Sequence, residues 1–489
     1  MQPAPDPTAS APAGPTASQA PAADTPFTPI QRLMLTLLCF ADCMVVLDFS
    51  IVNVAIPSIQ KTLGFTPEGV QWLFTGYGLV FGGFLLLGGR LSDLYGRKRI
   101  FMMGAALFTL ASLLGGLSVG PAMLVGMRCL QGLGAAMLAP SALALLMGAF
   151  EEGPQRNRAF GIWGTVAAAG YSIGVVLGGI LTAWLGWRWI LFVNVPLGLL
   201  VIGAAYRLMR EPPRPRARPR LDLLGSVLVT SGLMALVYAL AKAPTAGWTS
   251  LATWRLMGMA VLLLIAFVAV EAKTAEPLMP LRIFLLPGIA AANLVGTFLS
   301  AALVAMNLVL TLHFQQVLHY SPFMTGLAFL PHGLAASYAG PWGGRLSNKV
   351  GPKAVLVGGT ALVLVCLGLL SFISMRDSYW FLILPATVMM SFGLMPAFVT
   401  LTLLATSGAK EEDHGLVSGI VNTTGQLGGA LGLAVLVAVA AGRTAGLRAM
   451  GNIGETEALL SGFRLALTTG AGFVAVALLI GWVGLKKRA

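Results

Sequence analysis

The chain has 489 residues, of which 57% are hydrophobic and only 10% charged, and its mean hydropathy is +0.83. Soluble domains carry about a quarter charged residues. This composition therefore excludes soluble multidomain enzymes, disordered proteins and disulfide-rich scaffolds, and the continuous apolar runs exclude β-barrels, whose strands alternate with a period of two. What remains is an all-α polytopic membrane protein. The net charge of +13 then indicates basic cytoplasmic loops, and no nucleic-acid partner is expected.

Residues 1–29 contain eight prolines and no Lys or Arg. A secretory signal needs a basic start and an apolar middle, so we expect a disordered cytoplasmic tail here. From residue 30 onward, apolar runs of spanning length alternate with short polar gaps. They predict fourteen transmembrane helices at 31–56, 70–89, 100–119, 121–148, 160–184, 189–206, 222–242, 254–272, 288–313, 323–343, 354–374, 380–406, 415–441 and 463–485.

The distribution of basic residues predicts the orientation of these spans. With the N-terminus inside, 22 of the 31 Lys and Arg residues fall on the cytoplasmic side and 8 on the other. Cytoplasmic loops are enriched in Lys and Arg. We therefore expect an inner-membrane, multi-pass protein with both termini in the cytoplasm.

An internal repeat predicts the domain organisation. Residues 88–98 are GGRLSDLYGRK and residues 343–353 are GGRLSNKVGPK, so seven of eleven positions match at an offset of 255. Eight predicted spans separate the copies, an even number, so the two halves share one topology, as parallel repeats in transporters do. We expect a six-helix bundle at 30–206, a basic linker at 207–221, two extra spans at 222–287 and a second six-helix bundle at 288–489.

The first copy closely resembles the loop signature between the second and third helices of the major facilitator superfamily, which implies the fold of that superfamily. Gly96 permits a tight turn. Asp93 is expected to cap a helix or to pair with Arg97, and together with Arg90 these residues would form a latch that holds the cytoplasmic side shut. The alternative, a solvated basic loop, is disfavoured by the second copy. There, an asparagine and a proline replace the aspartate and one arginine, so the latch is asymmetric.

The first predicted span contains VVLDFSIVNVAIP at residues 45–57, which resembles a signature of the fourteen-spanner drug:proton antiporters within that superfamily. Its Asp42 and Asp48 are the only carboxylates placed well inside a span. A charged carboxylate there costs at least ~2.5–3.5 kcal/mol, so it is protonated, paired or in a wet cavity. The resemblance implies that Asp48 carries protons, so that Asp48→Asn abolishes coupled export while the protein still folds. Asp42 has no motif support, and a fixed structural role stays open for it.

The fourth predicted span contains RCLQGLGAAMLAPS at residues 128–141, which resembles a superfamily motif built around a buried arginine and a glycine. A guanidinium cannot be neutralised by deprotonation, so Arg128 needs an acidic or carbonyl partner. We expect it to bias the protonation of an aspartate in the first span. The alternative is that its side chain extends to the membrane interface.

The fifth predicted span has the glycine spacing of the superfamily's antiporter motif, with Gly170, Gly174, Gly178 and Gly179. Valine stands at position 175, where the motif has proline. Small residues at these steps allow close helix packing, and the resemblance implies antiport without leak. The segment WRWILFVNVPLG at 187–198 is also similar to the fourteen-spanner antiporters.

Few motifs mark the second half of the chain. By the resemblance, Asn293, Met306, Asn307 and His332 lie in cavity-forming helices and are candidates for the substrate cavity, although each could instead be packed or hydrogen-bonded. The chain has 21 Met and 24 Phe residues. Such side chains in a cavity suit varied lipophilic compounds.

The sequence contains no hydrolase triad, metal-ligand cluster, phosphate-binding loop or cofactor fingerprint, so we expect no enzyme activity, cofactor or metal. The resemblance implies a secondary transporter that exports amphipathic drugs or toxic organic compounds in exchange for protons. A cationic compound is favoured because a deprotonated aspartate attracts one. The expected partners are this small molecule, protons and the lipid bilayer, with no obligate protein partner. The alternatives are a symporter or uniporter of a small polar metabolite and a membrane sensor that does not transport.

Overall fold

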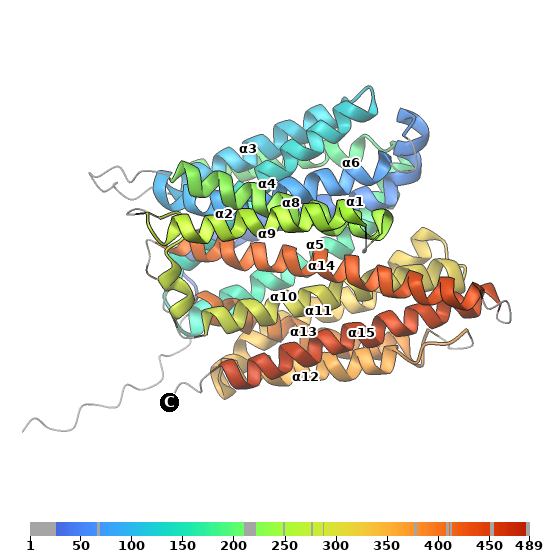
Figure 1. Cartoon of the computed structure of the whole chain (residues 1–489). Helices are drawn as coiled ribbons and strands as arrows, with labels where there is room; N and C mark the ends of the chain where they lie inside the picture. Colours follow the sequence, from blue (N-terminus) through green and yellow to red (C-terminus); the bar gives the residue numbers. More distant parts are fainter. Residues whose placement is uncertain are drawn as a thin grey trace, which may run out of the picture.

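The computed structural model describes residues 26–65, 69–209, 222–247, 250–274, 277–286, 288–375, 379–406, 410, 413–449 and 454–485. Most of the predicted tail and linker lies outside these ranges. The described chain consists of helices joined by short turns (Figure 1). The helices are α1 (Pro29–Leu63), α2 (Trp72–Tyr95), α3 (Arg97–Gly116), α4 (Pro121–Ala149), α5 (Pro154–Trp184), α6 (Trp189–Phe192), α7 (Asn194–Leu208), α8 (Leu223–Ala246), α9 (Leu251–Glu271), α10 (Ile289–Leu312), α11 (Pro322–Val350), α12 (Pro352–Leu370), α13 (Ile383–Thr406), α14 (His414–Ala449) and α15 (Glu455–Gly484). Short 3-10 turns span Gly69–Gln71 and Leu281–Leu285, and a π-helical turn spans His313–Val317.

Twelve helical segments within the described residues are long and apolar enough to cross a membrane. Helices α5 and α11 are 31 and 29 residues long and match two further predicted spans, but they are not among the twelve. The all-helical, multi-pass architecture is therefore confirmed. The number fourteen stays a prediction.

Helix ends differ from the predicted span ends because hydropathy detects only the apolar part of each helix. The capping box of Thr28 with Gln31 starts α1, and Gly64 ends it in the left-handed conformation at φ 71°. This helix thus continues well past the predicted end at residue 56. The span predicted at 189–206 corresponds to one membrane-crossing segment, Trp189–Leu208, which is divided at Val193 into α6 and α7.

Apolar side chains gather into separate cores at the two ends of the sequence. One core joins residues of α1–α5 and α7, together with Val399 of α13, and another joins residues of α10–α15. In Figure 1 the helices coloured blue to cyan form one group, and the yellow to red helices form the other. Each group buries its own apolar surface, so the interface between them is free to be the functional part of the molecule.

The two central helices, α8 and α9, lie beside this interface. A smaller apolar core joins them to α2 and α14, with Leu86, Val229, Phe267 and Leu416 among its members (Figure 1). Most of α9 is exposed, including Leu262 and other large apolar side chains, as expected for a helix that faces lipid.

Candidate functional site

The first group of helices encloses an ion pair. Oδ2 of Asp48 in α1 lies 2.5 Å from Nη1 of Arg128 in α4, and the two side chains are 0% and 1% exposed. Nε of Arg128 donates to the carbonyl of Leu73 in α2, and its guanidinium lies over the ring of Tyr77, 4.5 Å from the ring centre. Arg128 therefore does not extend to the membrane interface. Its partner is the aspartate that carries the antiporter resemblance.

Two side-chain amides donate further hydrogen bonds to Asp48. Neither residue was predicted from the sequence. Oδ1 of Asp48 accepts from Nε2 of Gln131 at 3.0 Å and from Nδ2 of Asn194 in α7 at 2.7 Å. Gln131 also donates to Ser112 in α3. Two features of the sequence could have indicated these residues. Gln131 follows Arg128 by three residues, which puts both on one helix face. Asn194 lies within the segment WRWILFVNVPLG.

Asp42, the other candidate in α1, has a different environment. Its side chain is partly exposed, and it makes no hydrogen bond or ion pair with the residues that the structure describes. Val46 lies four residues further along the same helix face and lines a cavity between the two groups of helices. The two aspartates thus belong to separate sites, one enclosed and one near the cavity.

The predicted latch lies at the α2–α3 turn, which we call the gate end. Gly96 makes this turn with φ 101°. The carboxylate of Asp93 accepts from the backbone N–H groups of Gly415 and Leu416, each at 2.9 Å, and lies 3.6 Å from Arg97. The stronger contact is therefore the first turn of α14 in the other group, where free N–H groups and the helix dipole favour a negative charge.

Arg90 is not part of the contact that Asp93 makes. Its Nη2 donates to the carbonyl of Pro277, 3.2 Å away, in the segment after α9. In that same segment, Leu278 and Met279 donate their backbone N–H groups to the buried carboxylate of Glu271. Arg90 thus connects the gate end to the segment after α9, while its positive charge also acts on the carboxylate of Asp93.

The two repeat copies pack in the same way. Gly89 of the first copy contacts α14, where a Cβ would lie 2.3 Å from the carbonyl oxygen of Gly415. Gly344 is the matching glycine of the second copy, and it contacts α5, where a Cβ would lie 2.6 Å from the carbonyl oxygen of Asn157. In each copy this glycine therefore lets one group of helices approach the other. The side chain of Asn157 also donates to Asn348, which replaces the aspartate of the first copy.

The lysines of the two copies also have equivalent roles. Lys98 donates to the backbone carbonyls of Tyr206 and Met209, at the end of α7. Lys353 donates to the carbonyl of Trp482, 2.7 Å away, at the end of α15. Cations are favoured at helix C-termini, so each copy secures the last helix of its own group.

The glycines of α5 pack against α1. A Cβ on Gly170, Gly174 or Gly178 would contact Cys43, Ser50 or Ile51, respectively. Only Gly allows the two backbones to come this close. Gly179 is half-buried, and no statement is possible for Val175, whose side chain is outside the description.

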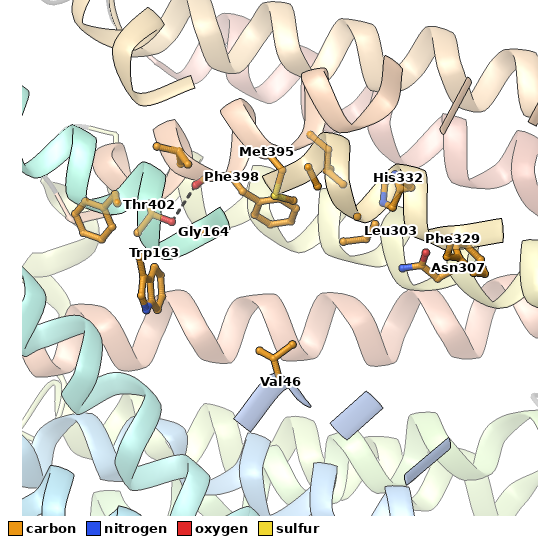
Figure 2. A pocket seen from close by; sticks show the side chains of 15 residues that line it. Val46, Trp163, Gly164, Leu303, Asn307, Phe329, His332, Met395, Phe398 and Thr402 are labelled. Atoms are coloured by element: carbon orange, nitrogen blue, oxygen red, sulfur yellow. Dashed lines mark hydrogen bonds between the residues drawn. The ribbon is translucent and has the colours of Figure 1, made fainter. Parts of the chain in front are cut away.

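A cavity of about 340 Å³ lies between the two groups of helices (Figure 2). Of the residues predicted to line the substrate cavity, Asn307 and His332 line this one. Asn293 and Met306 do not: Asn293 is bonded to Thr424 and to its own helix, and Met306 is 1% exposed within the apolar core. The lining residues are Val46, Phe160, Trp163, Gly164, Leu303, Asn307, Phe329, His332, Gly333, Ala336, Leu394, Met395, Phe398, Val399 and Thr402.

Comparison with known proteins decides the family. The family model of the Major Facilitator Superfamily matches residues 38–433. The chain belongs to this superfamily. It is therefore a multi-pass membrane transporter and not an enzyme. The crystal structure of a human organic anion transporter has the same fold, with a TM-score of 0.68 at 14% identity over 93% of this chain and 100% of that one.

Several curated superfamily members are similar along most of their length. A cephamycin export protein of Amycolatopsis lactamdurans is 42% identical, with 84% of this chain and 85% of the relative covered. A puromycin resistance protein of Streptomyces alboniger is 38% identical, with 93% and 91% covered. A tetracenomycin C resistance and export protein of Streptomyces glaucescens is 34% identical, with 82% and 74% covered.

Proposed function

We propose that this transporter exports amphipathic organic compounds across the inner membrane in exchange for protons. Export is supported by the names of its relatives, which are antibiotic export and resistance proteins. We further propose fourteen spans, formed by the twelve apolar segments with α5 and α11, and two six-helix bundles at 30–206 and 288–489. The excess of Lys and Arg supports a cytoplasmic position for the gate end and both termini.

The observation that carries the proposal is an apolar cavity between the bundles. It lies one helical turn from a carboxylate that makes no hydrogen bond or ion pair with the described residues. Val46 contributes to the cavity wall, and Asp42 precedes it on the same face of α1. The gate end is closed by the contacts of Asp93 and Gly89 with α14. In this conformation a compound in the cavity is separated from the cytoplasm.

The coupling to protons follows from this arrangement. Asp42 makes no hydrogen bond or ion pair with the described residues and is free to bind a proton, whereas Asp48 is enclosed by Arg128 and two amides. We assign proton exchange first to Asp42, with the Asp48–Arg128 pair as the element that must rearrange when the bundles rock. A polar hydrogen on a compound that extends past Val46 is attracted to deprotonated Asp42, so such a compound and a proton exclude one another there.

The test is transport in proteoliposomes with an imposed pH gradient, using lipophilic cations and neutral aromatic drugs as probes. Antiport predicts that an added probe dissipates the gradient and that the probe and the protons move in opposite directions. Movement in the same direction would establish symport and overturn the proposal. Probe movement that leaves the gradient intact would indicate a uniporter and overturn the coupling.

A further inference from the structure

Resting on the proposed export function, we propose a substrate class for the cavity: uncharged aromatic compounds that carry an O–H or N–H hydrogen-bond donor. The acceptor is Nε2 of His332 in α11. The argument uses the hydrogen bonds of this ring, the absence of charge from the cavity wall and the aromatic side chains around it.

The contacts of His332 determine which of its nitrogens carries the proton. Nδ1 lies 2.9 Å from the carbonyl oxygen of Thr387 and 2.8 Å from Oγ of Ser391. A carbonyl oxygen can only accept, so Nδ1 is the protonated nitrogen. In the neutral ring Nε2 then has a free lone pair, and it makes no hydrogen bond with any residue that the structure describes. Because His332 lines the cavity, this lone pair is available to a compound that donates a hydrogen.

The second polar group of the wall is also uncharged. The side-chain amide of Asn307 in α10 makes no hydrogen bond to the described part of the chain, and it can donate and accept. The hydroxyl of Thr402 is occupied by the carbonyl of Phe398 (Figure 2). In Figure 2 His332 and Asn307 lie toward one end of the cavity, and Trp163 and Thr402 lie toward the other. A bound compound therefore has a polar end and an apolar end.

The wall contains no Asp, Glu, Lys or Arg among its fifteen lining residues. A desolvated cation needs a counter-charge, and neither aspartate of α1, Asp42 or Asp48, is part of the wall. The expectation of a cationic compound is therefore not supported by the cavity. Four aromatic side chains line the same space: Phe160, Trp163, Phe329 and Phe398. They favour a flat aromatic body.

The experiment compares three probes that share one aromatic body: 1-hydroxypyrene, 1-methoxypyrene and (pyren-1-ylmethyl)trimethylammonium. Binding to the full-length protein in lipid nanodiscs is measured by energy transfer from tryptophan to pyrene, with empty nanodiscs as the background. We expect 1-hydroxypyrene to bind about three- to tenfold more tightly than 1-methoxypyrene, the range of one neutral hydrogen bond. We expect it to bind more tightly than the cation as well.

A variant pair assigns the preference to the histidine. His332→Phe should bind 1-hydroxypyrene and 1-methoxypyrene equally, because the acceptor is lost while the ring shape is kept. Thr402→Val is the control and should keep the preference, since its hydroxyl is already used within the chain. Equal binding of the two neutral probes to the unmodified protein, or tightest binding of the cation, overturns the proposal even where the histidine variant fails to fold.

The result is separable from the proposed function, because binding is measured at equilibrium without a pH gradient. If the three probes do not bind in the expected order of affinity, export in exchange for protons remains proposed, with another class of compound. Failure of proton coupling in proteoliposomes leaves the probe order unaffected.

Discussion

Asp48 and Arg128 form an ion pair with 2.5 Å between Oδ2 and Nη1, and neither side chain is more than 1% exposed. Asp42, six residues earlier on the same helix, is partly exposed and has no polar contact with the described residues. Asp48 is thus enclosed by hydrogen-bonding partners, whereas Asp42 has no such partner among the described residues.

We predict that Asp48→Asn destabilises the protein by about 3–5 kcal/mol, because it leaves the Arg128 guanidinium buried without a counter-charge. Thermal unfolding of detergent-purified protein measures this loss. Asp42→Asn is the matched control and should unfold like the unmodified protein. If Asp48→Asn is equally stable, the pair does not hold α1 and α4 together. The enclosed pair thus argues against the expectation that this variant folds normally.

Adjacent glycines at the gate end should have separable effects. A Cβ on Gly88 would lie 2.1 Å from the carbonyl of Ala136 within the first bundle, and a Cβ on Gly89 would lie 2.3 Å from Gly415 in the second. Gly88→Ala should therefore lower the unfolding temperature. Gly89→Ala should instead leave both bundles folded and move them apart at the gate end. The added methyl group would meet backbone atoms of α14, which cannot change rotamer to make room.

Spin-label distances between the exposed positions Tyr95 and Lys349, in different bundles, distinguish these outcomes. We expect the distance to increase for Gly89→Ala and not for the part of the Gly88→Ala protein that stays folded. An unchanged distance in Gly89→Ala would show that this contact does not determine closure.

Asp93→Asn should open the gate end more often. Its amide can accept only through one oxygen and loses the charge that favours the start of α14, a loss of about 1.5–3 kcal/mol for charge-assisted bonds. The readout is alkylation of Leu394→Cys in the cavity wall, in a cysteine-free background, by a reagent supplied from the gate end. Asn348→Ser, which removes the uncharged contact with Asn157 between the two groups in the second copy, is the comparison and should have a smaller effect. Equal alkylation of the Asp93 variant and the parent would contradict the latch.

Glu271→Ala should loosen the segment after α9, because the backbone N–H groups of Leu278 and Met279 lose their acceptor. Amide hydrogen exchange at these two positions is expected to rise. Arg90→Ala should raise exchange there as well, since Arg90 holds the carbonyl of Pro277. Unchanged exchange in both variants would show that α9 is attached to the gate end by apolar contacts alone.

Much of the fold could be predicted from the sequence because each span is a continuous apolar run, and the repeat at 88–98 and 343–353 is local in sequence. The equivalent packing of Gly89 and Gly344 follows from that repeat. The ends of α1 and the break at Val193 could not be predicted in the same way, because a helix continues beyond the membrane wherever caps and backbone hydrogen bonds allow.

The candidate site was less predictable because its partners come from different helices. Arg128 required an acidic or carbonyl partner on physical grounds, but only tertiary packing selects Asp48 over Asp42. Gln131 and Asn194 are isolated polar residues in apolar spans. Such a residue indicates that a hydrogen-bonding partner exists but does not identify it. For the same reason Asn293 was expected in the cavity and is instead bonded to Thr424.

The most direct test of the account is proton release when a compound binds. Purified protein in weakly buffered detergent solution is titrated with a probe that is transported in the proteoliposome assay, while a pH indicator reports free protons. The account predicts that the unmodified protein releases protons and that Asp42→Asn releases none while still binding the probe. Equal release from both would contradict the central claim that compound and proton exclude one another at Asp42.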